Sequence, residues 1–328
     1  MEYAIAVERL SKDFRTYKTE HGKKVFLASL RRKYYMKKAL RNVSFVVKKG
    51  EIVMLLGENG SGKSTLIKTL VGILHPDSGE VRVLGMDPWK ERIKIAWNYG
   101  MVSGAHGTLF NDLPAIDTFE YVRDLYEIPR PEFRKRLAYF IRILNLKDVY
   151  KKQVRTMSMG ERMKCNFIAS VLHLPKVVFM DEATIGMDLP SVINLREAIL
   201  DMQKKYSTTF FMTTHIVDEV KALARRVIII DRGRVVFDGN KTELLGLYGN
   251  KKYFEISFSK QPKIRLGRYG KVVSRGKGYV KLEIDPHIIR THKINTLLND
   301  RHVLDYNISD PDLSSVLVRF YKTKRKVV

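Results

Sequence analysis

The 328-residue chain has little cysteine, little glutamine and no long apolar run. Its single cysteine, Cys165, excludes an internal disulfide, and without a cluster of Cys and His a structural zinc site is not expected. A reducing cytoplasm is therefore the expected compartment. Apolar runs such as those at 177–180 and 227–230 fall far short of the ~20 residues that a membrane-spanning helix needs.

Basic residues outnumber acidic ones by 60 to 35, which gives a formal net charge of +25. The excess lies at the two ends: residues 1–50 hold 14 basic and 4 acidic side chains, and residues 251–328 hold 18 and 7. Residues 51–250 are nearly balanced, with 28 and 24. An anionic partner is expected, either a membrane surface or a nucleic acid.

The order of apolar and amphipathic segments predicts an α/β fold. Short apolar runs alternate with helical stretches through the middle of the chain, which is typical of a parallel sheet covered by helices. Strands are predicted at 51–56, 177–180, 208–213 and 227–230, and helices at 63–72 and 191–205. Residues 110–175 are mostly helical, with an amphipathic helix at 132–144, and predict a helical subdomain beside the sheet.

The pattern changes after about residue 248. Strands are predicted at 253–258, 279–284 and 303–308, and helices near 286–299 and 311–321. We therefore expect a core domain of residues 1–248 and a small α+β accessory domain of residues 249–328.

The strongest chemical signal is a glycine-rich loop between a predicted strand and a predicted helix. It predicts a nucleoside triphosphate site because its glycines let backbone N–H groups turn toward phosphates at the helix N-terminus. Lys63 would reach the terminal phosphates and the Ser64 hydroxyl would bind Mg²⁺. The candidate binding residues are Gly57, Asn59, Gly60, Ser61, Gly62, Lys63, Ser64 and Thr65.

Two other predicted strands end in polar residues at the edge where ligands bind in open α/β sheets. Asp181 would hold Mg²⁺ through water, and the adjacent Glu182 could polarise the water that attacks the γ-phosphate. Alone, this pair would more often be a solvated strand end. His215 could hydrogen-bond the γ-phosphate, although a histidine at a strand end is more often structural.

Together these motifs resemble the ATP-binding subunits of ABC transporters, over about residues 1–245. Met157-Ser158-Met159-Gly160-Glu161 precedes a helix about twenty residues ahead of the acidic strand, where the family has its signature motif. The stretch from Asp181 to Asp188 resembles the second acidic motif and the loop that follows it. Residues 110–118, 154–164 and 183–188 are most similar to the subgroup paired with ABC-2-type export permeases.

The resemblance implies a P-loop NTPase fold with an ABC-type ATPase core, and ATP and Mg²⁺ as cofactors. It also implies a head-to-tail homodimer, in which Ser158 and Gly160 of one subunit close over the γ-phosphate held by Lys63 of the other. Hydrolysis by Glu182 would then open the dimer. A separate transmembrane permease is implied as well, which would make the chain cytoplasmic and peripheral on the inner face of the membrane.

Three positions depart from the family pattern. The loop after Tyr99–Val102 lacks the usual Gln and has Ser103-Gly104-Ala105-His106 instead, where His106 could substitute. Glu161 stands where Gln is commoner, and Ala183 where Pro is commoner. The chain has only three glutamines, Gln153, Gln203 and Gln261. A general scarcity of Gln and a functional cause are therefore equally good explanations of the first two changes.

The N-terminal region offers an aromatic for adenine and a basic insertion. Phe14 is the best positional match for a residue that stacks on the base, and Tyr17 is its competitor. In the insertion, about 17–38, Phe26, Leu30 and Tyr34 fall on one helical stripe beside cations. Such a segment could lie on an anionic membrane, pack on the protein's own surface or contact the permease.

Two other functions compete with transport. The charge of +25 would also suit an ATPase that acts on ribosomes or nucleic acid, but such ABC proteins usually carry two ATP cores or long coiled coils, which are absent from this sequence. The missing loop Gln would suit a regulatory ATPase that barely hydrolyses ATP. The presence of Lys63, Asp181, Glu182 and His215 favours hydrolysis.

Overall fold

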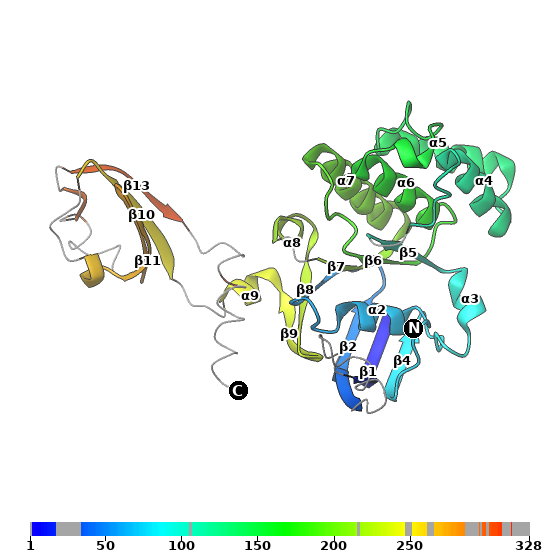
Figure 1. Ribbon diagram of the computed structural model, residues 1–328, viewed down its shortest axis with the longest axis horizontal. Coiled ribbons are helices and arrows are strands. Elements are labelled where there is room, and N and C mark those ends of the chain that lie inside the picture. The colour runs from blue at the N-terminus through cyan, green and yellow to red at the C-terminus, as the bar shows by residue number, and fades with distance from the viewer. Residues whose placement is uncertain are drawn as a thin grey trace, which may run out of the picture. The chain divides into compact units, whose positions relative to one another are not determined.

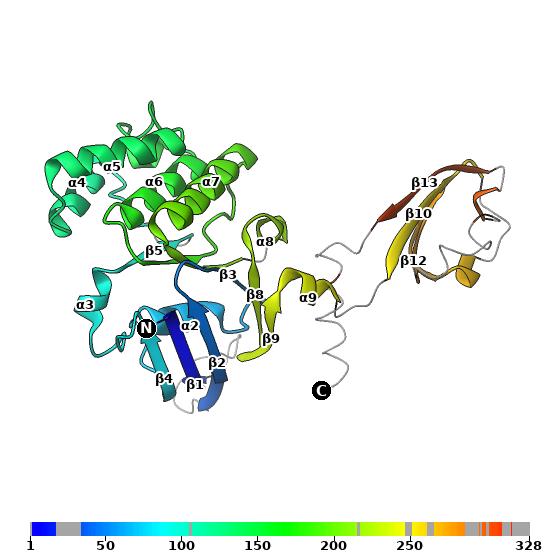
Figure 2. The same ribbon diagram turned by 180° about the vertical axis from the view of Figure 1, so that it is seen from behind.

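The computed structural model describes residues 2–17, 34–104, 107–214, 217–246, 251–260, 266–285, 295, 297–299, 302–309 and 316. The chain forms two compact units, residues 1–240 and 241–328 (Figures 1 and 2). The structure therefore changes unit at Asn240, whereas the sequence analysis changes domain after residue 248. The assignment of residues 249–328 to an accessory domain stays a prediction.

The first unit is built around a six-stranded sheet with the order β5-β6-β7-β3-β8-β9. All neighbouring pairs are parallel except β8 and β9, which are antiparallel. Its members are β3 (Ile52–Leu56), β5 (Tyr99–Ser103), β6 (Val177–Asp181), β7 (Thr209–Thr213), β8 (Arg226–Asp231) and β9 (Arg234–Asn240). The four predicted strands are confirmed, and their central residues are buried because both sheet faces are covered.

A second, three-stranded antiparallel sheet has the order β2-β1-β4 and was not predicted. It consists of β1 (Tyr3–Tyr17), β2 (Tyr34–Lys48) and β4 (Ser78–Val83). The helical stripe proposed for residues 17–38 is wrong at its described end: Tyr34 lies in β2 and pairs with Tyr17 of β1. Phe26 and Leu30 lie outside the described residues.

The helices of the first unit fall into two groups. α2 (Lys63–Leu70), α3 (Arg92–Ala96) and α8 (Val217–Leu223) follow individual strands. α4 (Ala115–Leu125), α5 (Arg130–Ile143), the short 3₁₀ helix η2 (Val154–Thr156) and α6 (Met159–Val171) all lie between β5 and β6 in the chain. With α7 (Leu189–Tyr206) they form the green helical cluster of Figure 1, where α6 contacts both α4 and α7. The predicted helices at 63–72, 132–144 and 191–205 are confirmed as α2, α5 and α7.

The main core of this unit joins the two sheets through α2. Buried residues of the antiparallel sheet, of α2 and of the large sheet form one hydrophobic cluster. Phe45 of β2 stacks on Phe211 of β7, with ring centroids 5.6 Å apart. Because α2 carries Lys63 at its first turn, this core fixes the phosphate loop relative to both sheets.

The second unit contains a four-stranded antiparallel sheet with the order β11-β12-β10-β13. Along the chain, the described elements of this unit are α9 (Lys241–Gly246), β10 (Lys252–Phe258), the 3₁₀ helix η3 (Leu266–Arg268), β11 (Lys271–Gly276), β12 (Tyr279–Ile284) and β13 (Val303–Ser309). The three predicted strands are confirmed as β10, β12 and β13. Buried side chains of β10 and β12 contribute to a separate core, against which the partly buried Val303 and Ile308 of β13 pack. The predicted helices near 286–299 and 311–321 lie mostly outside the described residues. None of the helices in the described ranges combines the length and hydropathy that a membrane span requires.

Candidate functional site

The glycine-rich loop joins β3 to α2 and packs closely against neighbouring backbone. A Cβ on Gly57 would lie 2.5 Å from the carbonyl oxygen of Ile230. Gly62 has a φ of +115°, and a Cβ there would lie 2.6 Å from the carbonyl oxygen of Ala39. Only glycine fits these positions. A side chain at Gly57 would lack space, and one at Gly62 would both lack space and require a left-handed backbone. The loop can therefore bring its N–H groups close to an anion at the start of α2.

Lys63 is 5% exposed and its ammonium is held inside the loop. Its Nζ donates hydrogen bonds to the carbonyl oxygens of Gly57 (2.7 Å) and Glu58 (3.2 Å) and lies 3.9 Å from Glu182 Oε1. Burial lowers the pKa of Lys63 from its ordinary value, and the charges of Glu182 and Asp181 oppose that shift. The lysine is thus positioned between the loop carbonyls and the acidic strand end.

The two acidic residues are oriented by Thr213 of β7, which sequence reasoning did not single out. Thr213 Oγ1 donates a hydrogen bond to Asp181 Oδ1 at 2.6 Å. The backbone N–H of Glu182 lies 3.0 Å from Thr213 Oγ1 and 3.2 Å from the Thr213 carbonyl oxygen. Glu182 has a φ of +52°, a left-handed conformation that is costly for a residue with a side chain and is concentrated at functional sites. The turn places the Glu182 carboxylate beside Lys63.

A cavity of about 670 Å³ brings the predicted residues together. Phe14, Asn59, Gly60, Gly62, Lys63, Ser64, Thr65 and Glu182 line it, and so do Arg15, Thr16, Lys37 and Ala39, which sequence reasoning missed. Tyr17, the competitor of Phe14, is not among these residues; its ring instead packs edge to face on Tyr34, with centroids 6.0 Å apart. This placement favours Phe14 for the base, and its stacking role stays a prediction.

Gly57, Ser61 and Asp181 belong to the same loop and strand end but do not line the cavity within the described part of the chain. Ser61 is buried, and its Oγ has no hydrogen-bond partner among the described residues. His215 lies outside the described residues, as do Ala105 and His106 of the loop that lacks the usual Gln. That loop begins beside the acidic pair, because the Gly104 N–H donates to the Asp181 carbonyl oxygen at 3.0 Å.

Ser158 and Gly160 lie at the start of α6 and are not among the described residues that line the cavity. Ser158 caps the helix: its Oγ accepts from the Glu161 N–H at 3.2 Å, and Glu161 Oε2 accepts from the Ser158 N–H at 2.8 Å. Gly160 allows α6 to approach α7 closely, because a Cβ would lie 2.5 Å from Asp188 Oδ1 and from Ser191 Oγ. The unusual Glu161 thus has a structural role, as the partner of Ser158 in a capping box.

Oxygen donors in the cavity and next to it suit a hard cation bound together with phosphate groups. Ser64 offers a hydroxyl and Asp181 a carboxylate, and Mg²⁺ in phosphate sites is held by one or two such groups, with water and phosphate oxygens completing its shell. Within the described ranges no group of three or more His, Cys, Asp or Glu forms a separate metal site. The residues present therefore fit Mg²⁺ that arrives with a nucleotide.

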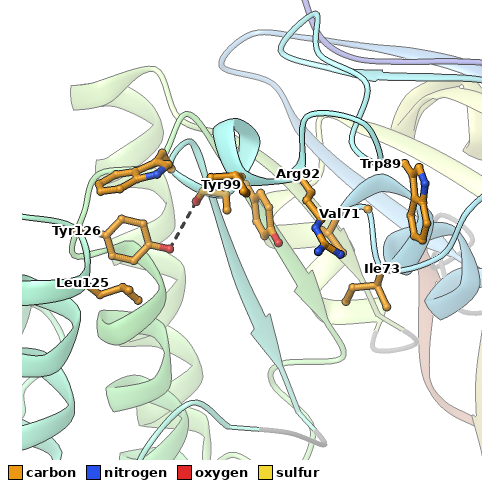
Figure 3. A pocket seen from close by; sticks show the side chains of 11 residues that line it. Val71, Ile73, Trp89, Arg92, Tyr99, Leu125 and Tyr126 are labelled. Atoms are coloured by element: carbon orange, nitrogen blue, oxygen red, sulfur yellow. Dashed lines mark hydrogen bonds between the residues drawn. The ribbon is translucent and has the colours of Figure 1, made fainter.

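A second cavity, of about 660 Å³, is lined mainly by apolar side chains (Figure 3). We call it the apolar groove. It lies between the end of α2, the α3 segment, β5 and the end of α4, and its lining includes Ile73, Trp89, Arg92, Ile93, Trp97, Tyr99, Leu125 and Tyr126. The Tyr126 ring packs edge to face on Trp97 on one side and stacks on His173 on the other, with centroids 5.5 and 3.9 Å apart.

Comparison with known proteins identifies relatives of the first unit. A family model described as ABC transporter matches residues 40–185. The ABC transporter ATP-binding protein NatA of Bacillus subtilis is 31% identical over 221 residues, which cover 67% of this chain and 88% of NatA. The linearmycin resistance ATP-binding protein LnrL of the same organism is 31% identical over 231 residues, 70% of this chain and 74% of LnrL.

Among solved structures, cbiO1 of Clostridium perfringens, described as part of the ABC transporter complex cbiONQ, aligns with a TM-score of 0.60 and 26% identity. The alignment covers 74% of this chain and 91% of cbiO1. These matches confirm the predicted family resemblance and the predicted fold of the first unit.

Proposed function

Since the chain belongs to the family of ABC transporter ATP-binding proteins, we propose that it hydrolyses ATP to power a separate membrane permease of the ABC-2 export type. ATP binding and ATPase activity belong to the family; the export type, the permease and the residue roles are the proposal. The observation that supports the roles best is the single cavity lined by Phe14, the phosphate loop and Glu182.

Each residue of the proposed site has a separate task. The loop N–H groups and Lys63 bind the terminal phosphates, and Phe14 stacks on the adenine. Ser64 and Asp181 would hold Mg²⁺, which when bound neutralises phosphate charge. Glu182 orients the attacking water and accepts its proton, and His215 donates a hydrogen bond to the γ-phosphate.

The proposal includes a head-to-tail homodimer. Within one chain Ser158 and Gly160 are not among the described residues that line the cavity containing Lys63, and Ser158 is exposed, which supports contact of this helix end with the nucleotide of a second copy. Closure would use the N-terminus of α6, where Ser158 caps the helix, and hydrolysis would release it.

The permease is the proposed occupant of the apolar groove. Exposed apolar patches with aromatic side chains are typical of protein interfaces, and an apolar groove suits one face of an amphipathic helix. Ile93 is 75% exposed at this groove. The end of α4 also lines the groove, and α4 belongs to the helical cluster that carries Ser158. A cytoplasmic helix of the permease bound there would contact the part of the chain that moves on dimer closure.

We also propose that the chain lies at the inner face of the membrane, where basic residues contact anionic lipid. The two ends carry most of the net charge, and Tyr34, Tyr35 and Met36, in the part of the basic insertion that belongs to β2, are exposed. Aromatic side chains next to cations suit a lipid headgroup region.

Replacement of the proposed catalytic base tests the reaction. We expect Glu182→Gln to retain ATP binding, lower turnover by about 100-fold or more and trap a dimer in MgATP, because an amide cannot accept the proton from water. Turnover measured by phosphate release and mass measured by light scattering check this. Glu197→Gln, an exposed residue of α7, is the matched control. Hydrolysis at the wild-type rate by Glu182→Gln would remove Glu182 from its proposed role.

Affinity purification tests the partner. The tagged chain is recovered from detergent-solubilised native membranes and from nuclease-controlled lysate, and the co-purifying molecules are identified. A multi-span membrane protein is the expected result. Ribosomes or nucleic acid without a membrane protein would contradict transport and favour the alternative of a nucleic-acid ATPase.

A further inference from the structure

The strands β1 and β2 place a second cation beside the residue proposed to bind adenine. Phe14 of β1 is paired directly with Lys37 of β2, and paired residues in an antiparallel ladder project from the same face. Both residues line the nucleotide cavity. Their neighbours Asp13 and Lys38 form the next pair, on the opposite face, and are not among the described lining residues.

The course of β2 fixes where along the nucleotide Lys37 lies. Ala39, two residues further along β2, also lines the cavity, and its carbonyl oxygen would lie 2.6 Å from a Cβ placed on Gly62 of the phosphate loop. Two residues of a strand span about 7 Å. Lys37 therefore lies directly opposite Phe14 and two strand residues from Ala39, the residue of β2 that packs near the phosphate loop.

We propose that Lys37 is a nucleotide-binding residue whose ammonium pairs with the α-phosphate of ATP. This inference rests on the proposed nucleotide site. The part of ATP between the base and the terminal phosphates is the ribose and the α-phosphate, and of these only the phosphate is anionic. A flexible lysine stem that carries a point charge suits such a contact.

The charges around the cavity support this assignment. Lys63 is held by the loop carbonyls and lies beside Glu182. The guanidinium of Arg15 lies over the ring of Tyr34 at 4.1 Å. Within the described ranges Lys37 makes no ion pair, so its ammonium is available to a ligand.

A comparison of Lys37→Met with Lys38→Met tests the proposal, because both remove one charge from adjacent exposed positions of the same strand. Affinities for ATP, ADP, AMP and adenosine are measured by titration calorimetry. We expect Lys37→Met to weaken all three nucleotides by about tenfold and to leave adenosine unchanged, since a charge-assisted hydrogen bond to the α-phosphate is lost. Lys38→Met should bind like the wild type, and Lys37→Arg should recover most of the affinity.

The salt dependence provides a second readout that a change in folding would not produce. ATP affinity of the wild type should fall more steeply with ionic strength than that of Lys37→Met, because the variant has one phosphate contact fewer. Equal effects of the Lys37 and Lys38 variants, or a loss confined to ATP, would overturn the α-phosphate assignment. Failure of the wild type to bind any adenine nucleotide would instead overturn the proposed site itself.

Discussion

The nucleotide cavity and the apolar groove have nearly equal volumes, about 670 and 660 Å³, yet they are built from different parts of the chain. The nucleotide cavity is formed by a tight backbone loop, a buried lysine and a carboxylate. The groove is formed by large side chains that remain exposed, among them Ile73, Trp89 and Ile93. A small anion needs fixed N–H groups and charges, whereas a protein segment needs apolar area. Volume alone would not have separated the two sites; their chemistry does.

The largest effect that separates the two cavities is expected from Lys63→Ala. Loss of the buried ammonium should weaken ATP binding on the order of 100-fold, because a charged donor to the terminal phosphates is removed. Lys68→Ala, an exposed residue of the same helix, serves as the control and should bind ATP as the wild type does. Titration calorimetry measures both. Unchanged affinity of the Lys63 variant would count against the assignment of the phosphate loop.

The converse variant places a charge in the groove. Ile93→Asp should lower the amount of tagged chain retained with native membranes several-fold while ATP affinity in solution stays unchanged, because a carboxylate in an apolar interface must lose its water. Leu200→Asp, at a 44% exposed position of α7 outside the groove, controls for surface charge. Equal retention of the two variants would show that the groove is not the docking surface.

A further expected effect is a pH dependence of stability that arises behind the groove and leaves both cavities' ligands untouched. Burial lowers the pKa of His173 to about 4; its Nε2 contacts the Tyr99 carbonyl oxygen at 3.1 Å, and its Nδ1 has no partner among the described residues. The unfolded chain binds this proton near pH 6.5 and the folded chain does not. The free energy of unfolding should therefore fall between about pH 6.5 and 4, by up to about 1.4 kcal/mol per pH unit.

His173→Phe keeps a ring that can stack on Tyr126 and removes the titrating group. Chemical denaturation at several pH values between 7 and 5 should show a shallower loss of stability for this variant than for the wild type. Parallel slopes would contradict the burial of a neutral imidazole at this position.

The phosphate site could be predicted from the sequence because each part of it has a local signature. β3, β6, β7 and β8 are buried on both faces, so each appears as a continuous apolar run. The glycines of the loop are required by a left-handed φ or by close backbone contact, which limits the residues that fit. The sequence analysis did not recognise the capping box of Ser158 and Glu161, although a Ser followed three residues later by Glu is its sequence signature.

The remaining features depend on contacts between distant segments. β1 and β2 mix buried and exposed residues, and several bulges interrupt their register, so the short apolar run at residues 3–7 was not recognised as part of a long strand pair. Lys37 could not be assigned to the site before its pairing with Phe14 was known. The apolar groove likewise joins α3, β5 and the end of α4, and its exposed tryptophans, Trp89 and Trp97, were the one available signal.

The position of β3 between β7 and β8 also has a consequence for synthesis on the ribosome. The phosphate loop packs on β8 and the turn that follows it. The carbonyl oxygen of Ile230 lies beside Gly57, and the Gly233 N–H donates a hydrogen bond to the Ser61 carbonyl oxygen at 2.8 Å. During synthesis, the phosphate loop therefore lacks these backbone contacts until β8 and the following turn have left the exit tunnel. Such long-range pairing also forms slowly. A chain arrested before β8 would carry the complete glycine motif but no rigid site, so nucleotide cannot stabilise the polypeptide during most of its elongation.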